Sequence, residues 1–261
     1  MKFGFIGCGN MGGALAKALS LSTKDYLITD RSGKAKALAE ELGCQYASVN
    51  KIASSCDAIF LGVKPQGMQQ VLWEISNVLQ EKKPLLISMA AGLTTAQIEA
   101  YAGGNLPVIR IMPNTPVAVS QGLIPYCCND RVEASVEADF LAHMKYAGIL
   151  DPFPESLMDA VSALSGSGPA FVYIFAAAMA DGAVACGIPR EKAHTYAAQT
   201  ILGAASMMLE SSKHPSQLKD EVCSPGGSTI CGIKSLEDHA FRGTVMECIQ
   251  ATYRRNLELG K

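Results

Sequence analysis

The sequence predicts an α/β chain with two domains: a parallel-sheet domain over residues 1–153 and an all-helical domain over residues 154–261. Short apolar runs alternate with helix-forming stretches in the first part, which is the pattern of repeated βα units. A glycine-rich turn follows the first apolar run. Beyond Leu157 no strand-like run occurs in the sequence, and long helical patterns take over.

The strands of the first domain are expected where apolar residues run without interruption, as in strands covered on both faces. These runs are residues 3–6, 26–29, 58–63, 85–89 and 108–112. Residues 123–126 and 148–153 are expected to add edge strands, since Pro125 suits an edge position. Helices are expected between the strands at 14–19, 34–42, 68–79 and 95–101, the second of them closed by Gly43.

The second domain is expected to contain helices over residues 157–164, 169–186, 190–210 and 215–222 and then to the C-terminus. Residues 165–170 and 224–228 are expected to be loops between them. The segment 169–188 is apolar enough to suggest a membrane span, but it contains Asp181 and lacks aromatic or basic anchors. A helix apolar all round is also expected in a subunit interface, so we expect a homodimer.

Composition narrows the function classes. Hydrophobic residues make up 49% and charged residues 18% of the chain, and the net charge is −2, which gives no basic surface for nucleic acid or anionic lipid. The nine cysteines form no CxxC pair and no Cys/His ligand spacing. We therefore expect reduced thiols, a cytoplasmic protein without a signal peptide, and no metal, nucleic-acid or membrane partner.

The glycine-rich turn indicates a Rossmann-type dinucleotide site. Gly7, Gly9 and Gly12 form GxGxxG after an apolar run and before helix formers. Gly7 permits the turn, Gly9 admits the pyrophosphate, and Gly12 lets helix and strand pack closely. The N–H groups at the start of the new helix then face the phosphates.

The coenzyme preference stays open at this stage. Asp30 ends the second apolar run, where an acid can accept a hydrogen bond from the adenosine ribose 2′-OH and favour NAD. An N-cap of the next helix is the alternative role. Arg31, Ser32 and Lys34 follow at once and could hold a 2′-phosphate instead. We therefore expect both NAD(H) and NADP(H) to support turnover.

Three further strand ends and one loop are candidate ligand contacts. Lys64 and Pro65 follow the run 58–63, and either a cofactor contact or a plain strand-to-helix turn fits these residues. Residues 88–92 and 112–116 occupy the corresponding ends of two other strands. Gly226 and Gly227 precede Ser228 and Thr229 at a helix start, which makes either a nest for a small carboxylate or a capped turn. Arg110, in the middle of a predicted strand, is expected to be structural.

Taken together, the motifs resemble the Δ1-pyrroline-5-carboxylate reductases, and the resemblance spans the chain. It rests on FIGCGNM at 5–11, VKP at 63–65, MPNTP at 112–116, LSGSGPA at 164–170, HP at 214–215, LKD at 218–220 and CSPGGSTI at 223–230. The resemblance implies a Rossmann domain, a helical domain that interleaves with its twin, homodimers that often form decamers, and reduction of a cyclic imine to L-proline by NADPH or NADH.

The resemblance also implies roles for individual residues. Besides Asp30, Arg31 and Ser32, the resemblance implies the following cofactor contacts: Ile6, Gly7, Cys8, Gly9, Asn10, Met11, Asn50, Val63, Lys64, Pro65, Gln66, Met89, Ala90, Ala91 and Glu221. The substrate contacts it implies are Glu155, Gly227, Ser228 and Thr229, with backbone N–H groups on the carboxylate and the Thr229 hydroxyl as the catalytic group at the ring nitrogen.

Two rival functions remain: a hydroxy-acid or imine reductase with another substrate, and a nucleotide-sensing module without turnover. Alcohol oxidation needs a base at the hydroxyl, and residues 171–180 contain no lysine that could supply one. A sensor has no need of a second, carboxylate-binding turn at 224–229. A protonated cyclic imine needs no base, because it accepts hydride at carbon without forming an alkoxide.

Overall fold

The structure, a computed structural model, describes residues 1–259. It contains two compact units, each described by itself below. One unit is Met1–Ser167 together with the chain from Thr252 onward, and the other is Gly168–Ala251. The domain boundary expected after residue 153 stays a prediction.

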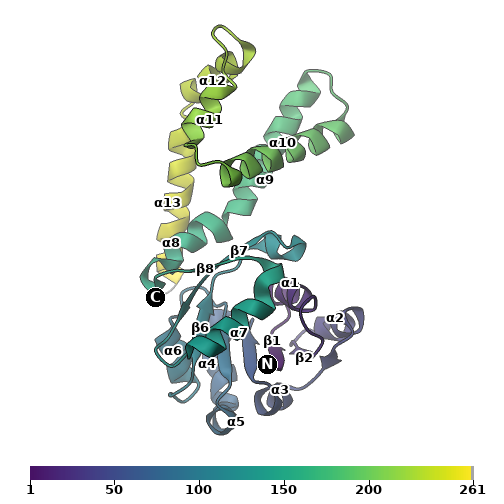
Figure 1. Ribbon diagram of the computed structural model, residues 1–261, viewed down its shortest axis with the longest axis vertical. Helices are drawn as coiled ribbons and strands as arrows, with labels where there is room; N and C mark the ends of the chain where they lie inside the picture. The colour runs from purple at the N-terminus through teal and green to yellow at the C-terminus, as the bar shows by residue number, and fades with distance from the viewer. Residues whose placement is uncertain (260–261) are drawn as a thin grey trace. The chain divides into compact units, whose positions relative to one another are not determined.

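The first unit contains one eight-stranded sheet in the order β3-β2-β1-β4-β5-β6-β7-β8 (Figure 1). Its strands are β1 (Phe3–Ile6), β2 (Tyr26–Thr29), β3 (Gln45–Tyr46), β4 (Ala58–Leu61), β5 (Leu85–Ser88), β6 (Val108–Ile111), β7 (Gly122–Cys128) and β8 (Gly148–Pro152). Strands β1 to β6 are parallel, β7 runs antiparallel to β6, and β8 runs parallel to β7. The order reverses between β1 and β4, which is where such sheets bind ligands.

The five continuous apolar runs are confirmed as buried strands, although β4, β5 and β6 end one or two residues earlier than expected. The prediction of two edge strands is half wrong, because β7 lies between β6 and β8 and only β8 is at the edge. Pro125 is tolerated in β7 because the antiparallel pairing with β6 covers only Tyr126 to Cys128. Pro125 still accepts a hydrogen bond from the Met112 N–H through its carbonyl, at 2.8 Å.

Helices cover both faces of this sheet. They are α1 (Asn10–Leu19), α2 (Lys34–Leu42), α3 (Val49–Ser55), α4 (Pro65–Glu74), α5 (Ser76–Lys82), α6 (Thr95–Tyr101), α7 (Ala134–Met144) and α8 (Met158–Val161), with short 3₁₀ turns at Thr115–Val119, Lys145–Ala147 and Glu155–Leu157. The single helix expected at 68–79 is wrong. The chain leaves helical geometry at Ile75, which buries its side chain and separates α4 from α5.

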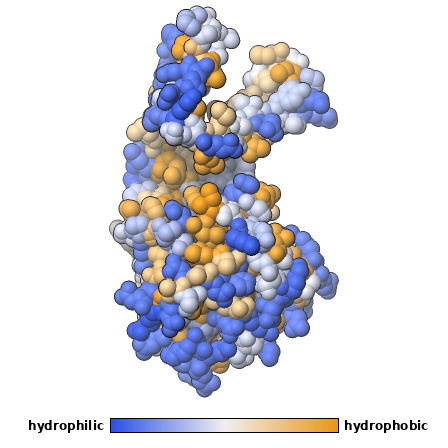
Figure 2. Space-filling view, viewed as in Figure 1, coloured by the Kyte–Doolittle hydropathy of each residue, from blue (hydrophilic) through white to orange (hydrophobic). Residues whose placement is uncertain are grey.

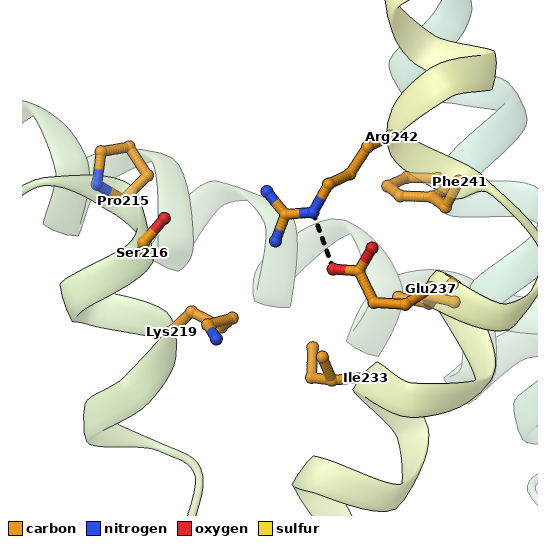
Figure 3. A pocket seen from close by; sticks show the side chains of 8 residues that line it. Pro215, Ser216, Lys219, Ile233, Glu237, Phe241 and Arg242 are labelled. Carbon is orange, nitrogen blue, oxygen red and sulfur yellow. Dashed lines mark hydrogen bonds and ion pairs between the residues drawn. The ribbon is translucent and has the colours of Figure 1, made fainter.

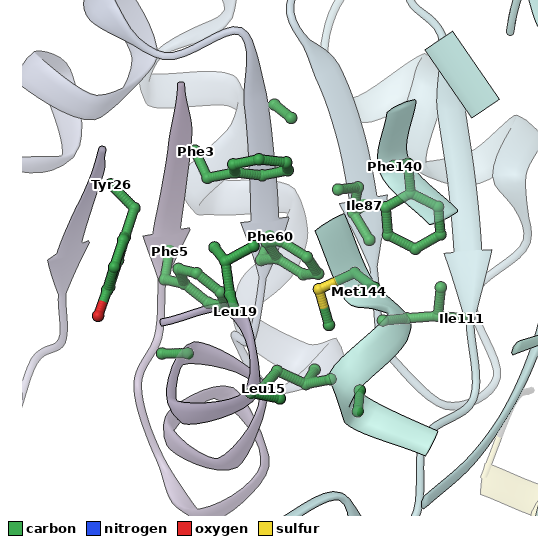
Figure 4. Packing of buried hydrophobic residues seen from close by; sticks show 14 of the residues in the cluster. Phe3, Phe5, Leu15, Leu19, Tyr26, Phe60, Ile87, Ile111, Phe140 and Met144 are labelled. Carbon is green, nitrogen blue, oxygen red and sulfur yellow. The ribbon is translucent and has the colours of Figure 1, made fainter. Parts of the chain in front are cut away.

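Two apolar clusters hold the layers together. On one face Phe5 stacks on Phe60 with ring centroids 4.4 Å apart, and Phe140 of α7 lies 6.4 Å from Phe60 (Figure 4). Leu15 and Leu19 of α1 belong to the same cluster. The other cluster packs α3 to α6 against the opposite face of the strands. Burial on both faces explains why the strands read as continuous apolar runs.

The second unit is helical. Its elements are α9 (Gly168–Ala185), α10 (Arg190–Glu210), α11 (Pro215–Glu221), α12 (Ser228–Asp238) and the greater part of α13 (Phe241–Leu259). The loop expected at 165–170 is wrong: a π-helical turn spans Ser162–Gly166 and α9 starts at Gly168. The Ser167 N–H donates to the Ser162 carbonyl at 3.1 Å, so the Ser/Gly-rich segment keeps its backbone bonded inside a helix.

The helices of the second unit leave apolar side chains exposed. Only Ala180, Ala193 and Ala197 form its buried cluster, whereas Tyr173 and Ile174 of α9 are 64% and 71% exposed. Figure 2 shows apolar residues on the surface of these helices. By length and composition one described helix, Glu155–Ala185, could cross a membrane, and 6% of its apolar window is buried; a single such helix is weak support for a span.

Candidate functional site

The carboxyl ends of the parallel strands bring the predicted site residues to one edge of the sheet. Ile6 of β1 is in register with Thr29 of β2 and with Leu61 of β4, and Leu61 is in register with Ser88 of β5. The residues that follow these strand ends are therefore neighbours along the edge. A cleft of about 700 Å³ opens there, and we call it the carboxyl-edge cleft.

Nine of the predicted cofactor contacts line the carboxyl-edge cleft: Ile6, Gly7, Gly9, Asp30, Arg31, Ser32, Val63, Lys64 and Gln66. Val49, Gln70 and Val71 also line it and were missed by the sequence reasoning. A signal for Gln70 was available, since it lies one helical turn after Gln66 on α4 and so shares its face. Val49 carries no comparable signal in its own segment.

Three glycines crowd around one carbonyl group at the first turn. Gly7 has φ +102°, which favours glycine, and a Cβ placed on Gly12 or Gly62 would lie 2.2 or 2.1 Å from the Gly7 oxygen. No side chain fits at Gly12 or Gly62 without moving backbone. The end of β1, the start of α1 and the residue after β4 are thus held at backbone contact.

Gly9 differs from these three, because a Cβ on it would meet no atom within 4 Å. It is the N-cap of α1 and supplies no side-chain hydrogen bond to the helix start. The first N–H groups of α1 therefore point into open space beside the cleft, with the positive end of the helix dipole behind them. This cradle fits the pyrophosphate of a dinucleotide, and the residues present match what such a cofactor needs.

Asp30 is not the N-cap residue of α2, although the N–H groups at the start of this helix act on its carboxylate. The N-cap is Gly33, with φ +79° and no side-chain cap. The Ser32 hydroxyl donates to Oδ2 of Asp30 at 2.5 Å. Partial burial raises the pKa of Asp30, but this hydroxyl and the N–H groups at the start of α2 outweigh it and leave the pKa below its ordinary value. Asp30 is therefore ionised at neutral pH.

Cys8 and Asn10 line a second hollow of about 390 Å³ beside Gly9 and Ser32, which we call the α1–α2 hollow. Burial raises the pKa of the Cys8 thiol to about 12, and the charge of Asp30 adds to the effect. The thiol is therefore neutral and unsuited to nucleophilic chemistry.

The other predicted cofactor residues lie outside both hollows. Pro65 is the first residue of α4, and Asn50 follows Val49 at the start of α3. Met89, Ala90 and Ala91 follow β5, and the Met89 N–H bonds to the Leu61 carbonyl. Met11 lies in the first turn of α1. Glu221 ends α11 in the second unit, where its carboxylate pairs with Lys213 at 2.6 Å.

Glu155, a predicted substrate contact, has protein partners for both carboxylate oxygens. Oε1 accepts from the Thr95 N–H at 2.7 Å and Oε2 from the Thr95 hydroxyl at 3.0 Å. The buried Arg110 guanidinium lies 3.6 Å from Glu155 and 3.2 Å from Asp159. The structural role expected for Arg110 is confirmed: it ties β6 to the segment that begins the long helix.

The predicted substrate turn lies in the second unit. Gly226 has φ +70°, and the helix α12 begins at Ser228 with Gly227 as an N-cap that supplies no side-chain bond. A Cβ on Gly227 would lie 2.3 Å from the Ser224 hydroxyl, so the Ser224 side chain would have to move to admit one. Ser228 and Thr229 are exposed. The turn therefore presents uncapped N–H groups beside two hydroxyls.

Two further hollows are lined by other residues, except that Glu155 lines one of them. An apolar one of about 280 Å³ is lined by α11, α12 and the start of α13, where Arg242 Nε pairs with Glu237 at 2.7 Å (Figure 3). A polar one of about 490 Å³ adjoins Glu155, and in it Arg131 pairs with Glu99 at 2.6 Å. Within residues 1–259 no group of three or more His, Cys, Asp or Glu side chains could hold a metal.

Two family models match the chain. One, described as pyrroline-5-carboxylate reductase dimerisation, matches residues 155–259, and the other, described as NADP oxidoreductase, coenzyme F420-dependent, matches residues 2–92. The chain is 40% identical to the pyrroline-5-carboxylate reductase of Escherichia coli K12, over 100% of this chain and 98% of that protein. It is 39% identical to that of Pisum sativum, over 98% and 95%.

The solved structures agree. The pyrroline carboxylate reductase of Plasmodium falciparum with NADP bound has a TM-score of 0.90 and 33% identity, and the match covers 100% of this chain and 98% of that one. An imine reductase from Myxococcus stipitatus, at 19% identity and a TM-score of 0.51, shares the fold alone.

Gly9→Ala is predicted to weaken coenzyme binding without loss of stability, whereas Gly12→Ala is predicted to lower the stability of the fold. Gly9→Ala should leave the free energy of unfolding within about 0.5 kcal/mol of the parent, because the methyl group meets no protein atom. It should weaken dinucleotide binding at least tenfold, because it narrows the cradle. Gly12→Ala should cost about 1–3 kcal/mol of stability through overpacking against Gly7.

Urea unfolding and calorimetric titration with NADP⁺ or NAD⁺ measure both quantities. Unchanged coenzyme affinity in Gly9→Ala would place the pyrophosphate elsewhere.

Proposed function

The chain belongs to the pyrroline-5-carboxylate reductase family, and on that premise we propose that it reduces 1-pyrroline-5-carboxylate to L-proline. This proposal rests on the sequence similarity to that family over the full length of the chain. The open cradle at Gly9 and the uncapped start of α12 support it, because the reaction needs one site for a dinucleotide and one for a small carboxylate.

The coenzyme is NADPH or NADH, which supplies the hydride when bound. Gly7 to Met11 would hold its pyrophosphate through the N–H groups at the start of α1. Val63 to Gln66 would line its ribose side, and Met89 to Ala91 would lie toward the nicotinamide. Small residues after β5 leave room for the ring. These roles orient the coenzyme and exclude water from it.

The substrate turn would hold the carboxylate and the ring nitrogen together. The N–H groups of Ser228 and Thr229 donate to the carboxylate, and the Thr229 hydroxyl accepts from the N–H of the protonated imine. Hydride adds to the carbon of the C=N bond, whose electron pair becomes the lone pair of the product amine. The imine nitrogen is protonated before transfer, so no side chain has to donate a proton as a general acid at that step.

The homo-oligomer is proposed as a dimer built on the helical unit, with a decamer as the larger assembly. The exposed apolar residues of α9 support this, since about two-thirds of a stable interface core is apolar. The partner is then a second copy of the chain, in a cytoplasmic enzyme without nucleic-acid or membrane partners.

The direct test of the function is consumption of NADPH or NADH, followed by absorbance, on addition of 1-pyrroline-5-carboxylate. Stoichiometric formation of L-proline is expected. Coenzyme binding without consumption would favour a sensing module. Turnover with 2-oxo acids and not with the imine would favour the hydroxy-acid rival.

Thr229→Ala is predicted to lower kcat about ten- to a hundredfold while coenzyme binding stays nearly intact. Losing one hydrogen bond to a charged group costs roughly 1.5–3 kcal/mol, which sets this range. Thr229→Ser should keep most activity, because the hydroxyl remains. Ser235→Ala, which removes an exposed hydroxyl from the same helix, is the control and should leave kcat unchanged.

A wild-type kcat and an unaltered KM in Thr229→Ala would mean that only the backbone of the turn matters.

Ala177→Glu is predicted to abolish soluble assembly. Ala177 is exposed in the middle of α9, so a dimer that covers this helix would bury an unpaired carboxylate, which is costly. Ala142→Glu introduces the same side chain at an exposed position of α7 in the first unit and serves as the control. Light scattering reports the mass of each variant. A fully active monomer would contradict the dimer.

A further inference from the structure

The segment between β5 and α6, residues 89–94, is fixed at the end where it leaves the sheet. We call it the β5–α6 loop, and it contains the small residues proposed to lie toward the nicotinamide. The Met89 N–H donates to the Leu61 carbonyl at 3.4 Å, and the Ser88 hydroxyl oxygen accepts from the Ala90 N–H at 3.3 Å. The start of the loop is therefore bonded to β4 and β5.

The far end of the loop is held at the start of α6. Thr94 is the N-cap and forms a capping box with Gln97. Thr95, the first residue of the helix, has an N–H group that finds no partner within the helix. This N–H donates to Oε1 of Glu155 at 2.7 Å, and the Thr95 hydroxyl donates to Oε2 at 3.0 Å. A carboxylate 60 residues away in sequence thus completes the cap at the positive end of α6.

Glu155 is itself held in place by a buried cation. The guanidinium of Arg110 is 3% exposed and lies 3.6 Å from Glu155 and 3.2 Å from Asp159. Its Nε atom is buried and has no hydrogen-bond partner, so the buried charge depends on these two carboxylates. Both oxygens of Glu155 are engaged by Thr95, and any other ligand of the carboxylate would have to displace that residue.

We propose that Glu155 is a positioning residue for hydride transfer, because its hold on Thr95 fixes the β5–α6 loop where the nicotinamide ring has to lie. Glu155 acts through Thr95 and touches neither coenzyme nor substrate, which differs from the substrate contact that the resemblance implied. The rate of transfer depends steeply on the placement of the reacting atoms, so a loop released at one end slows it. This proposal rests on the proposed function.

Glu155→Ala removes both hydrogen bonds to Thr95. Hydrogen–deuterium exchange of the amides at 89–97 should become faster in the coenzyme-free protein. The value of kcat should fall about ten- to a hundredfold, while KM for the imine changes little. The dissociation constant of adenosine 2′,5′-bisphosphate, a fragment without the nicotinamide half, should stay unchanged, because the cradle at Gly9 is untouched.

Glu155→Gln and Thr95→Ser are the rescue variants. Gln keeps the size of the side chain and an oxygen that accepts from the Thr95 N–H, and Ser keeps both the N–H and the hydroxyl. Both variants should retain the exchange rates of the parent protein and most of its kcat. A carboxylate that contacts the charged imine would respond differently, since Glu155→Gln would then raise KM for the imine.

Asp159→Asn is the matched control. It removes the other carboxylate from Arg110 but has no contact with Thr95. Like Glu155→Ala, it leaves the buried guanidinium with one anionic partner, so both variants should lower Tm. Exchange at 89–97 and kcat should nevertheless stay at the parent values in Asp159→Asn, with every variant assayed at a temperature where it is folded.

The outcomes separate this proposal from the function on which it rests. Unchanged exchange at 89–97 in Glu155→Ala, or a kcat equal to that of the parent, would overturn the proposal alone. Equal losses in Asp159→Asn would also overturn it, because the effect would then come from the Arg110 cluster as a whole. Faster exchange in Glu155→Ala, in a protein whose parent form does not reduce 1-pyrroline-5-carboxylate, would support the hold on the loop and overturn the proposed function.

Discussion

The contact of three glycines around the Gly7 carbonyl is the constraint on which the site depends. A side chain at Gly12 or Gly62 would lie 2.2 or 2.1 Å from that oxygen, so β1, α1 and the end of β4 are joined at backbone distance. The first N–H groups of α1 are thereby fixed at the edge of the sheet, next to the residues that follow β2 and β4. Of the three motif glycines, Gly7, Gly9 and Gly12, Gly9 alone has open space where a side chain would be, and a pyrophosphate can occupy this opening.

Each of the two units offers charged or polar groups to a different ligand. The first unit offers a positive helix end and one ionised carboxylate, Asp30, at the same edge. The second unit offers a turn with uncapped N–H groups before Thr229. The reduction of an imine that is already protonated on nitrogen requires no further acid or base from the protein at the step of hydride transfer. The exposed apolar side chains of α9 are explained by subunit assembly and not by this chemistry.

Much of the first unit could be predicted because buried parallel strands are continuous apolar runs and GxGxxG carries a mechanism. Other elements gave weak or misleading signals. β3 is two exposed residues, Gln45–Tyr46, without an apolar run. Ser and Gly at 165–168 suggested a loop, yet a π-helical turn keeps their backbone bonded. The partners of Arg110 are 45 or more residues away in sequence, so no local pattern could reveal them. Tertiary contacts decided these cases.

The most direct test of the account is a crystal structure of the protein with NAD⁺ or NADP⁺ bound. We expect the pyrophosphate within hydrogen-bond distance of the N–H groups at the start of α1, against the Cα of Gly9, with the adenosine ribose beside Asp30. A dinucleotide bound in the polar hollow next to Glu155 and Arg131, or anywhere else away from Gly9, would contradict it.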